Sequence, residues 1–244
     1  MGKFDFSSWA KAHKTRLCQP EAQPALLRAL WERCADFTFR GDILKARKKI
    51  NSQTLAQKNR IKPETLLEFF YTAANEQIYN QFAFSSGERQ DTSRIAADMI
   101  ALDFNATDPD PRRRRPVITQ IIELKVNPSA GDFYHACYEV IYYYFLMLRA
   151  QTRKDPPAVR FTARYALAQP ITLIVRAPAD FLQKDKTRKK AFLSALNTLL
   201  TPQKAQLSFE PIPETFLPRL NEIQQIAHYY EYCKLCLLHV NKKK

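Results

Sequence analysis

One strand-like segment of the sequence combines apolar character with two opposite charges. Residues 117–126 are mostly β-branched or aliphatic, yet they contain Glu123 and Lys125. Because side chains alternate along a strand, Glu123 and Lys125 point to the same face, and Leu124 points to the other. Two charges within a buried strand are costly unless they pair with each other or bind a partner. The pattern marks a candidate site, and the alternative is an exposed Glu–Lys pair.

A second apolar segment, residues 95–104, carries a carboxylate at Asp98. If the two segments pair as strands, Asp98 comes close to Glu123, and two carboxylates meet the ammonium of Lys125 at a sheet edge. Carboxylate oxygens suit a hard divalent cation, and an ammonium beside them can act on a metal-bound water. Asp103 is the rival carboxylate in this segment. It points to the opposite face and is assigned to the end of the strand.

The elements that must position these side chains follow from periodicity. Apolar residues recur at helical spacing from Pro63 onward, and this stripe comprises Leu67, Tyr71, Ala74, Ile78 and Phe82. The predicted helices cover residues 63–84, 132–148, 184–200 and 221–239. The predicted strands cover residues 95–104, 117–126, 171–176 and 206–209, the first two as an antiparallel pair. This order predicts an α/β fold with a mixed central β-sheet flanked by helices.

The charge of the chain favours a polyanionic partner. Lys and Arg number 38 against 24 Asp and Glu, and residues 1–60 alone hold thirteen basic and five acidic side chains. We therefore expect a basic helical N-terminal extension over residues 1–60 and a folded domain over residues 61–244. Nucleic acid is the first candidate partner, ahead of an acidic membrane surface. The alternative is a basic protein whose charge serves solubility.

Other features limit the class of protein. The longest apolar run, residues 140–148, is far shorter than the roughly 20 residues that a membrane helix needs. The N-terminus lacks the apolar stretch of a secretory signal, so we expect a cytoplasmic protein without a membrane partner. Five cysteines without a framework spacing argue against a disulfide-rich secreted fold. Cys233 and Cys236, flanked by histidines, are either ordinary helix cysteines or part of a zinc site.

Two basic clusters are candidate phosphate contacts. The first lies in a loop with three prolines and comprises Arg112, Arg113, Arg114 and Arg115. The second lies on a predicted helix and comprises Lys184, Lys186, Arg188, Lys189 and Lys190. The alternative for the first cluster is a solvated loop whose charge is neutralised by its own aspartates. The alternative for the second is the ordinary exposed face of a helix.

Taken in order, residues 62–212 resemble the PD-(D/E)xK nuclease superfamily, which has the restriction-endonuclease-like fold. Asp98 resembles the aspartate of the first motif, with Ala97 in place of the usual proline, and the residues from Glu123 to Lys125 resemble the second motif. His135 stands in the following helix, where the family commonly has a glutamine, and is a candidate helper.

The family also has a glutamate in the helix before these strands. Glu76, which lies 22 positions before Asp98, resembles it. Glu64 and Glu68 are the alternatives, and we prefer Glu76 because it leans toward the predicted core.

The resemblance implies a metal-dependent nuclease that hydrolyses phosphodiester bonds of nucleic acid, DNA rather than RNA. Asp98, Glu123 and the carbonyl of Leu124 would hold Mg²⁺ or Mn²⁺, and Glu76 would assist a second ion or a metal-bound water. Lys125 would orient or deprotonate the attacking water and stabilise the developing charge. The alternative function is a catalytically inactive nucleic-acid-binding or protein-interaction module on the same fold. A homodimer is compatible with either function.

Overall fold

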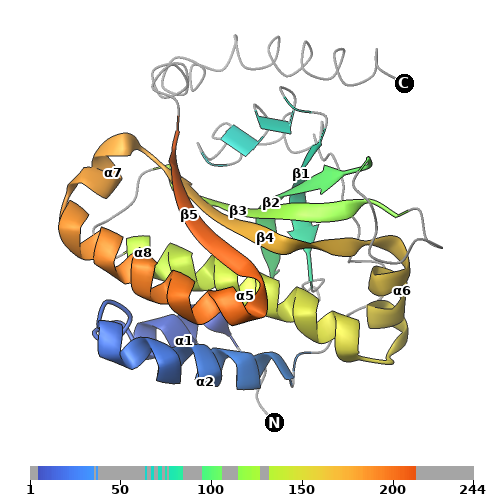
Figure 1. Ribbon diagram of the computed structural model, residues 1–244, viewed down its shortest axis with the longest axis horizontal. Helices are drawn as coiled ribbons and strands as arrows, with labels where there is room; N and C mark the ends of the chain where they lie inside the picture. Colours follow the sequence, from blue (N-terminus) through green and yellow to red (C-terminus); the bar gives the residue numbers. More distant parts are fainter. Residues whose placement is uncertain are drawn as a thin grey trace, which may run out of the picture.

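The computed structural model describes residues 5–35, 37, 64, 67–68, 71–72, 75, 77–84, 95–105, 115–126 and 132–212. Within this part of the chain, five strands form one mixed sheet in the order β1-β2-β3-β4-β5 (Figure 1). They are β1 (Ile78–Ala83), β2 (Ala96–Asp103), β3 (Val117–Leu124), β4 (Ala166–Ala177) and β5 (Ala205–Pro211). The pairs β1–β2 and β2–β3 are antiparallel, and the pairs β3–β4 and β4–β5 are parallel. The expected α/β architecture with a mixed sheet is confirmed.

Helices connect the parallel strands, because such neighbours cannot be joined by a tight hairpin. The chain passes from β3 to β4 through α5 (Asp132–Thr152) and α6 (Pro156–Arg164). It passes from β4 to β5 through α7 (Ala179–Gln183), α8 (Lys186–Leu200) and the short helix η2 (Thr201–Gln203). Helices α5 and α8 cover one face of the sheet, and the described helical residues between 64 and 72 lie on the opposite side (Figure 1).

The N-terminal segment forms a further layer on α5 (Figure 1). It comprises α1 (Phe6–Ala12), the short helix η1 (Pro20–Ala22) and α2 (Gln23–Ala35). Leu26 and Leu30 lie on one face of α2, and both are buried. These residues share one apolar cluster with α5 and the inner face of the sheet. The described half of the expected N-terminal extension is therefore joined to the rest of the fold by a continuous core.

The tyrosines of α5 belong to this core. Tyr138, Tyr142, Tyr143 and Tyr144 are all buried. The ring of Phe6 from α1 stacks on Tyr142 with centroids 5.3 Å apart.

No helix in the described part of the chain is long and apolar enough to cross a membrane.

One predicted helix is wrong in its second half. Residues 78–83 form the edge strand β1 rather than the last turns of a helix that begins at Pro63. Inside this strand Asn80 is buried, and its amide donates a hydrogen bond of 3.3 Å to the Glu68 carboxylate. Helix α6 was also not predicted. The predicted helix over residues 221–239, with Cys233 and Cys236, lies outside the described residues.

Candidate functional site

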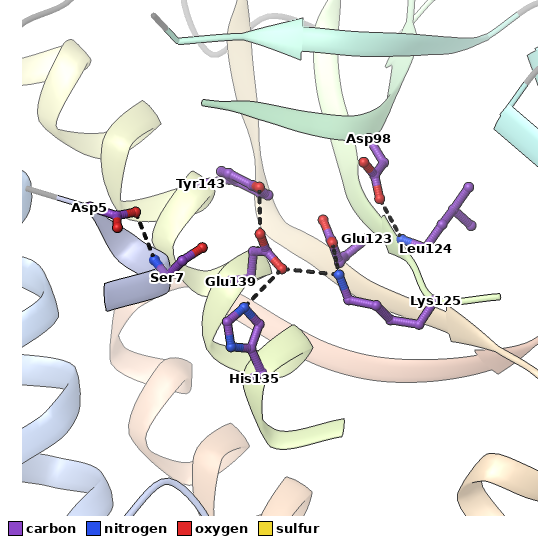
Figure 2. Close-up of polar contacts among 9 residues, drawn as sticks. All are labelled: Asp5, Ser7, Asp98, Glu123, Leu124, Lys125, His135, Glu139 and Tyr143. Atoms are coloured by element: carbon purple, nitrogen blue, oxygen red, sulfur yellow. Dashed lines mark hydrogen bonds and ion pairs between the residues drawn. The ribbon is translucent and has the colours of Figure 1, made fainter. Parts of the chain in front are cut away.

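The pairing of β2 with β3 brings Asp98 and Glu123 together. Met99 pairs with Ile122 and Ile100 pairs with Ile121, so one further step in the same register sets Asp98 opposite Glu123. The backbone N–H of Leu124 donates a 2.9 Å hydrogen bond to Oδ2 of Asp98 (Figure 2). This is the juxtaposition that alternation along two antiparallel strands predicts.

Lys125 completes this end of the sheet. Its backbone N–H donates to the carbonyl of Arg176 at 2.8 Å, which extends the β3–β4 ladder by one residue. Its Nζ lies 2.5 Å from Oε1 of Glu123 and 3.2 Å from Oε2 of Glu139 (Figure 2). The ammonium therefore bridges a strand carboxylate and a carboxylate from α5.

Glu139 was not predicted from the sequence, although the sequence holds a signal for it. It is the single charged residue in the stretch from Phe133 to Leu148, apart from the histidine at 135. The Tyr143 hydroxyl donates a 3.1 Å hydrogen bond to Oε1 of Glu139, and Nε2 of His135 lies 3.6 Å from Oε2. Spacings of four residues place these three side chains on one face of α5. His135 is thus connected to Lys125 through the carboxylate of Glu139, which lies between them.

The electrostatics of the cluster reflect burial and crowding of like charges. Burial raises the pKa of Asp98 to about 6, against the opposing effect of Lys125. Burial and the charges of Asp98 and Glu139 raise the pKa of Glu123 well above its ordinary range. For Glu139, burial is outweighed by Lys125 and His135, which lower its pKa. Burial disfavours the charged form of Lys125, but its carboxylate neighbours raise its pKa and keep it an ammonium.

The carboxylate oxygens of Asp98 and Glu123 are of the type that hard divalent cations bind. Oε2 of Glu123 is buried and has no hydrogen-bond partner within the described residues. An unpaired carboxylate oxygen in a buried position costs free energy unless a ligand satisfies it. The described residues contain no group of three or more His, Cys, Asp or Glu side chains that could hold a metal ion. The set implied by the resemblance has only two carboxylates, those of Asp98 and Glu123, with the carbonyl of Leu124.

Three glutamates were candidates for the helical glutamate of the site, and the structure describes two of them. Glu76, our preferred residue, lies outside the described residues. Glu64, one of the two alternatives, lies close enough to Asp98 for its charge to contribute to the raised pKa of that residue. Glu68, the other alternative, is buried and accepts a hydrogen bond from Asn80.

The expected phosphate contacts divide into three groups. Arg112, Arg113 and Arg114 lie outside the described residues. Arg115 is half-buried just before β3, and its guanidinium donates to the backbone carbonyl of Thr162 on α6. The exposed members of the helix cluster are Lys184, Lys186, Arg188 and Lys190.

Lys189 is a correction to the expected helix cluster, because its side chain is buried. Its Nζ lies 4.6 Å from the ring centroid of Phe181 and 5.1 Å from that of Phe133, and it donates to the Phe181 carbonyl. Lys189 thus contributes to the packing between α8, α7 and α5 and is not available to a partner at the surface.

No protein-family model, curated protein or solved structure matches the chain. The candidate site is therefore defined by its own residues, namely Asp98, Glu123, Lys125 and Glu139, with His135 and Tyr143 beside them.

Asp98→Asn should stabilise the protein in the absence of metal at neutral pH. The pKa of about 6 in the folded protein lies above the ordinary value of 3.8, so the folded state holds the proton more tightly. The stabilisation by this proton is complete below about pH 4 and is lost as pH rises through about 6. Asparagine removes the charge but keeps an oxygen for the Leu124 N–H.

Thermal unfolding with a chelator, measured across this pH range, tests the expectation. The melting temperature of Asp98→Asn should exceed that of the wild type by a few degrees above pH 6, and the difference should shrink at acidic pH. Asp103→Asn, the same change at the far end of β2, is the matched control and should not reproduce the gain. A lower melting temperature for Asp98→Asn at neutral pH would show that the Asp98 charge stabilises the fold.

Proposed function

We propose that the protein is a metal-dependent nuclease that hydrolyses phosphodiester bonds of DNA. The observation that carries this proposal is the convergence of Asp98, Glu123 and Lys125 where the beginning of β2 lies beside the end of β3. The Asp98 carboxylate accepts from the Leu124 N–H, and the Lys125 ammonium lies 2.5 Å from the Glu123 carboxylate. Carboxylates with a neighbouring ammonium provide both a cation site and a fixed positive charge, and this pair of features suits phosphodiester hydrolysis.

The architecture is compatible with the restriction-endonuclease-like fold, which forms part of the proposal. Helical residues, the strand with Asp98, the strand ending in Glu123 and Lys125, and the helix α5 follow one another in the order that the resemblance implies. The edge strand β1 stands between the first helical residues and the Asp98 strand.

In this proposal Asp98, Glu123 and the Leu124 carbonyl would hold Mg²⁺ or Mn²⁺. The bound cation would supply Lewis-acid stabilisation of the phosphodiester and lower the pKa of a bound water. Oε2 of Glu123, which has no donor among the described residues, is the oxygen best placed to serve as a ligand. Asp98 would contribute Oδ1, since the hydrogen bond from Leu124 uses Oδ2.

Lys125 would orient the attacking water and stabilise the negative charge that develops on the phosphate. An ammonium has three donors, and the donors of Lys125 that reach Glu123 and Glu139 account for two of them. The third has no acceptor among the described residues, so it can reach a water or a phosphate oxygen. Glu139, itself held by Tyr143, is a positioning residue that fixes the direction of this donor.

Cleavage assays with defined metals test the proposal. With Mg²⁺ or Mn²⁺ the protein should cut DNA, and a chelator should stop the reaction, with activity returning when the metal is added back. RNA and single-stranded DNA of the same sequence define the substrate range. A folded protein that binds DNA but cuts none of these substrates with any of the metals would contradict the proposal.

A second candidate function is a nucleic-acid-binding module without catalytic activity. The observation that favours it is the bridging of Glu123 and Glu139 by Lys125, because such a network can be purely structural. The two functions differ in the outcome of the chelator experiment, since binding by basic side chains does not require a divalent cation.

A further inference from the structure

Two segments far apart in the sequence form one positively charged surface, which we call the cationic edge. The first segment contributes Lys11, Lys14 and Arg16 from the end of α1 and the chain after it. The second contributes Lys184, Lys186 and Arg188 from the start of α8. All six side chains are exposed. Within residues 11–18 and 184–190, Asp185 is the single acidic residue.

A direct contact joins the two segments. Nη2 of Arg188 lies 3.3 Å from Sγ of Cys18, two residues after Arg16. In Figure 1 the loop that follows α1 and the first turns of α8 lie at the same end of the molecule. The positive charges of the N-terminal segment therefore continue those of α8 rather than forming a separate patch.

The cationic edge lies at the same edge of the sheet as the candidate site. Leu124, beside Lys125, pairs with Arg176 near the end of β4, and the chain passes from that strand through the short helix α7 to the start of α8. On α5, Tyr134 precedes His135 of the site. Burial raises the pKa of Tyr134, and the nearby Arg188 guanidinium acts in the opposite direction. Arg188 thus contacts Cys18 of the N-terminal segment and lies near Tyr134 at the start of α5.

None of the described residues that form the cationic edge carries a fully exposed aromatic ring. Proteins that hold single strands combine basic residues with exposed aromatic rings on which bases stack. Among the described residues, Phe104 is the one exposed aromatic side chain, and it lies just beyond β2, at the opposite end of that strand from Asp98. A surface with positive charge and no stacking rings suits the regular phosphate backbone of a duplex.

We propose that the cationic edge binds the phosphate backbone of double-stranded DNA and leads the duplex to the site of Asp98, Glu123 and Lys125. The delivery of the duplex to the site rests on the proposed nuclease function. Binding of the duplex can be measured without cleavage. Because the contacts are to phosphates, affinity should depend on salt and be nearly independent of base sequence.

Binding of the full chain to a short DNA duplex, with a chelator present, tests this inference. The variant Lys14→Gln with Arg188→Gln removes one cation from each segment. Its affinity for the duplex should fall about tenfold. The slope of the logarithm of the binding constant against the logarithm of the salt concentration should become less steep by about 2. The control Lys154→Gln with Arg164→Gln also removes one lysine and one arginine, both exposed, from the region of α6. Its affinity should stay close to that of the wild type.

Three results would overturn the inference. The first is equal loss of affinity in the control, which would mean that net charge alone governs binding. The second is tighter binding of either separated strand than of the duplex. The third is tighter binding to vesicles of phosphatidylcholine and phosphatidylserine than to the duplex, which would indicate a membrane surface as the partner.

The failure of this inference is distinct from the failure of the proposed function. If the Lys14→Gln/Arg188→Gln variant loses affinity but the wild type cuts no DNA with Mg²⁺ or Mn²⁺, the cationic edge stands and the nuclease proposal fails. If the wild type cuts DNA and the variant binds and cuts like the control, the nuclease proposal stands and the cationic edge fails.

Discussion

Lys125→Ala should lower metal-dependent DNA cleavage by about 10²–10³-fold, the range for removal of one preorganised donor to developing charge. Binding of DNA should change little, because the ammonium acts mainly in the transition state and the cationic edge remains intact. The measurement is the single-turnover cleavage rate beside the dissociation constant of the same duplex. Lys204→Ala, at an exposed lysine after α8, controls for the loss of one positive charge.

The fold must be monitored in the same experiment, because Lys125 also bridges Glu123 and Glu139. Lys125→Arg keeps a positive charge but not the compact ammonium, so it should restore stability without restoring cleavage. The opposite outcome is a wild type that cuts no substrate and a Lys125→Ala variant that loses several kcal/mol of unfolding free energy, the range for breaking a buried pair. Glu123 and Lys125 would then be a structural ion pair, and the binding module would be the better description.

The relation between Asp98 and Glu123 was predictable because it depends on strand alternation alone. Both residues interrupt apolar strands, and two neighbouring antiparallel strands place such residues on one face. The places of α5, α8 and the later strands along the chain were predictable from their strong apolar periodicity. The periodicity shows through although α8 buries Lys189 and α5 carries Glu139.

The strand β1 was missed because the spacing of its apolar residues fits both a helix and a strand. Ile78 and Phe82 are four positions apart, and this spacing returns to the same face both in a helix and in a strand. The residue between them on the strand face is Asn80, whose polar side chain hides the alternation. Asn80 is buried because Glu68, distant in sequence, accepts its hydrogen bond. A tertiary contact of this kind cannot be read from local periodicity.

Glu139 was missed for a different reason. The stretch around it has the apolar periodicity of a core helix, and the expected polar helper was His135. A lone carboxylate in such a helix is costly unless a cation faces it. The cation is Lys125, which reaches Glu139 only because α5 crosses the end of β3. The charge anomaly was visible in the sequence, but its partner was not.

Removal of residues 1–35 should abolish cooperative folding of the protein. The segment was expected to be a basic extension, but Leu30 of α2 is completely buried. The Trp31 ring packs edge-on to Phe145 of α5 with centroids 5.3 Å apart, and Arg149 donates to the Trp31 carbonyl at 3.1 Å. Without this layer, α5 would expose the apolar face that carries Tyr138, Tyr142 and Phe145.

Thermal and urea unfolding of the truncated chain measure this effect, and a point variant keeps the test informative if the truncated chain aggregates. Leu30→Ala in the full chain should cost about 2–5 kcal/mol, as other buried leucines do. Arg28→Ala on the exposed side of α2 should change stability by no more than about 0.5 kcal/mol. A truncated chain that unfolds cooperatively at the wild-type temperature would contradict this expectation. Residues 1–35 would then contribute charge for binding and not support for α5.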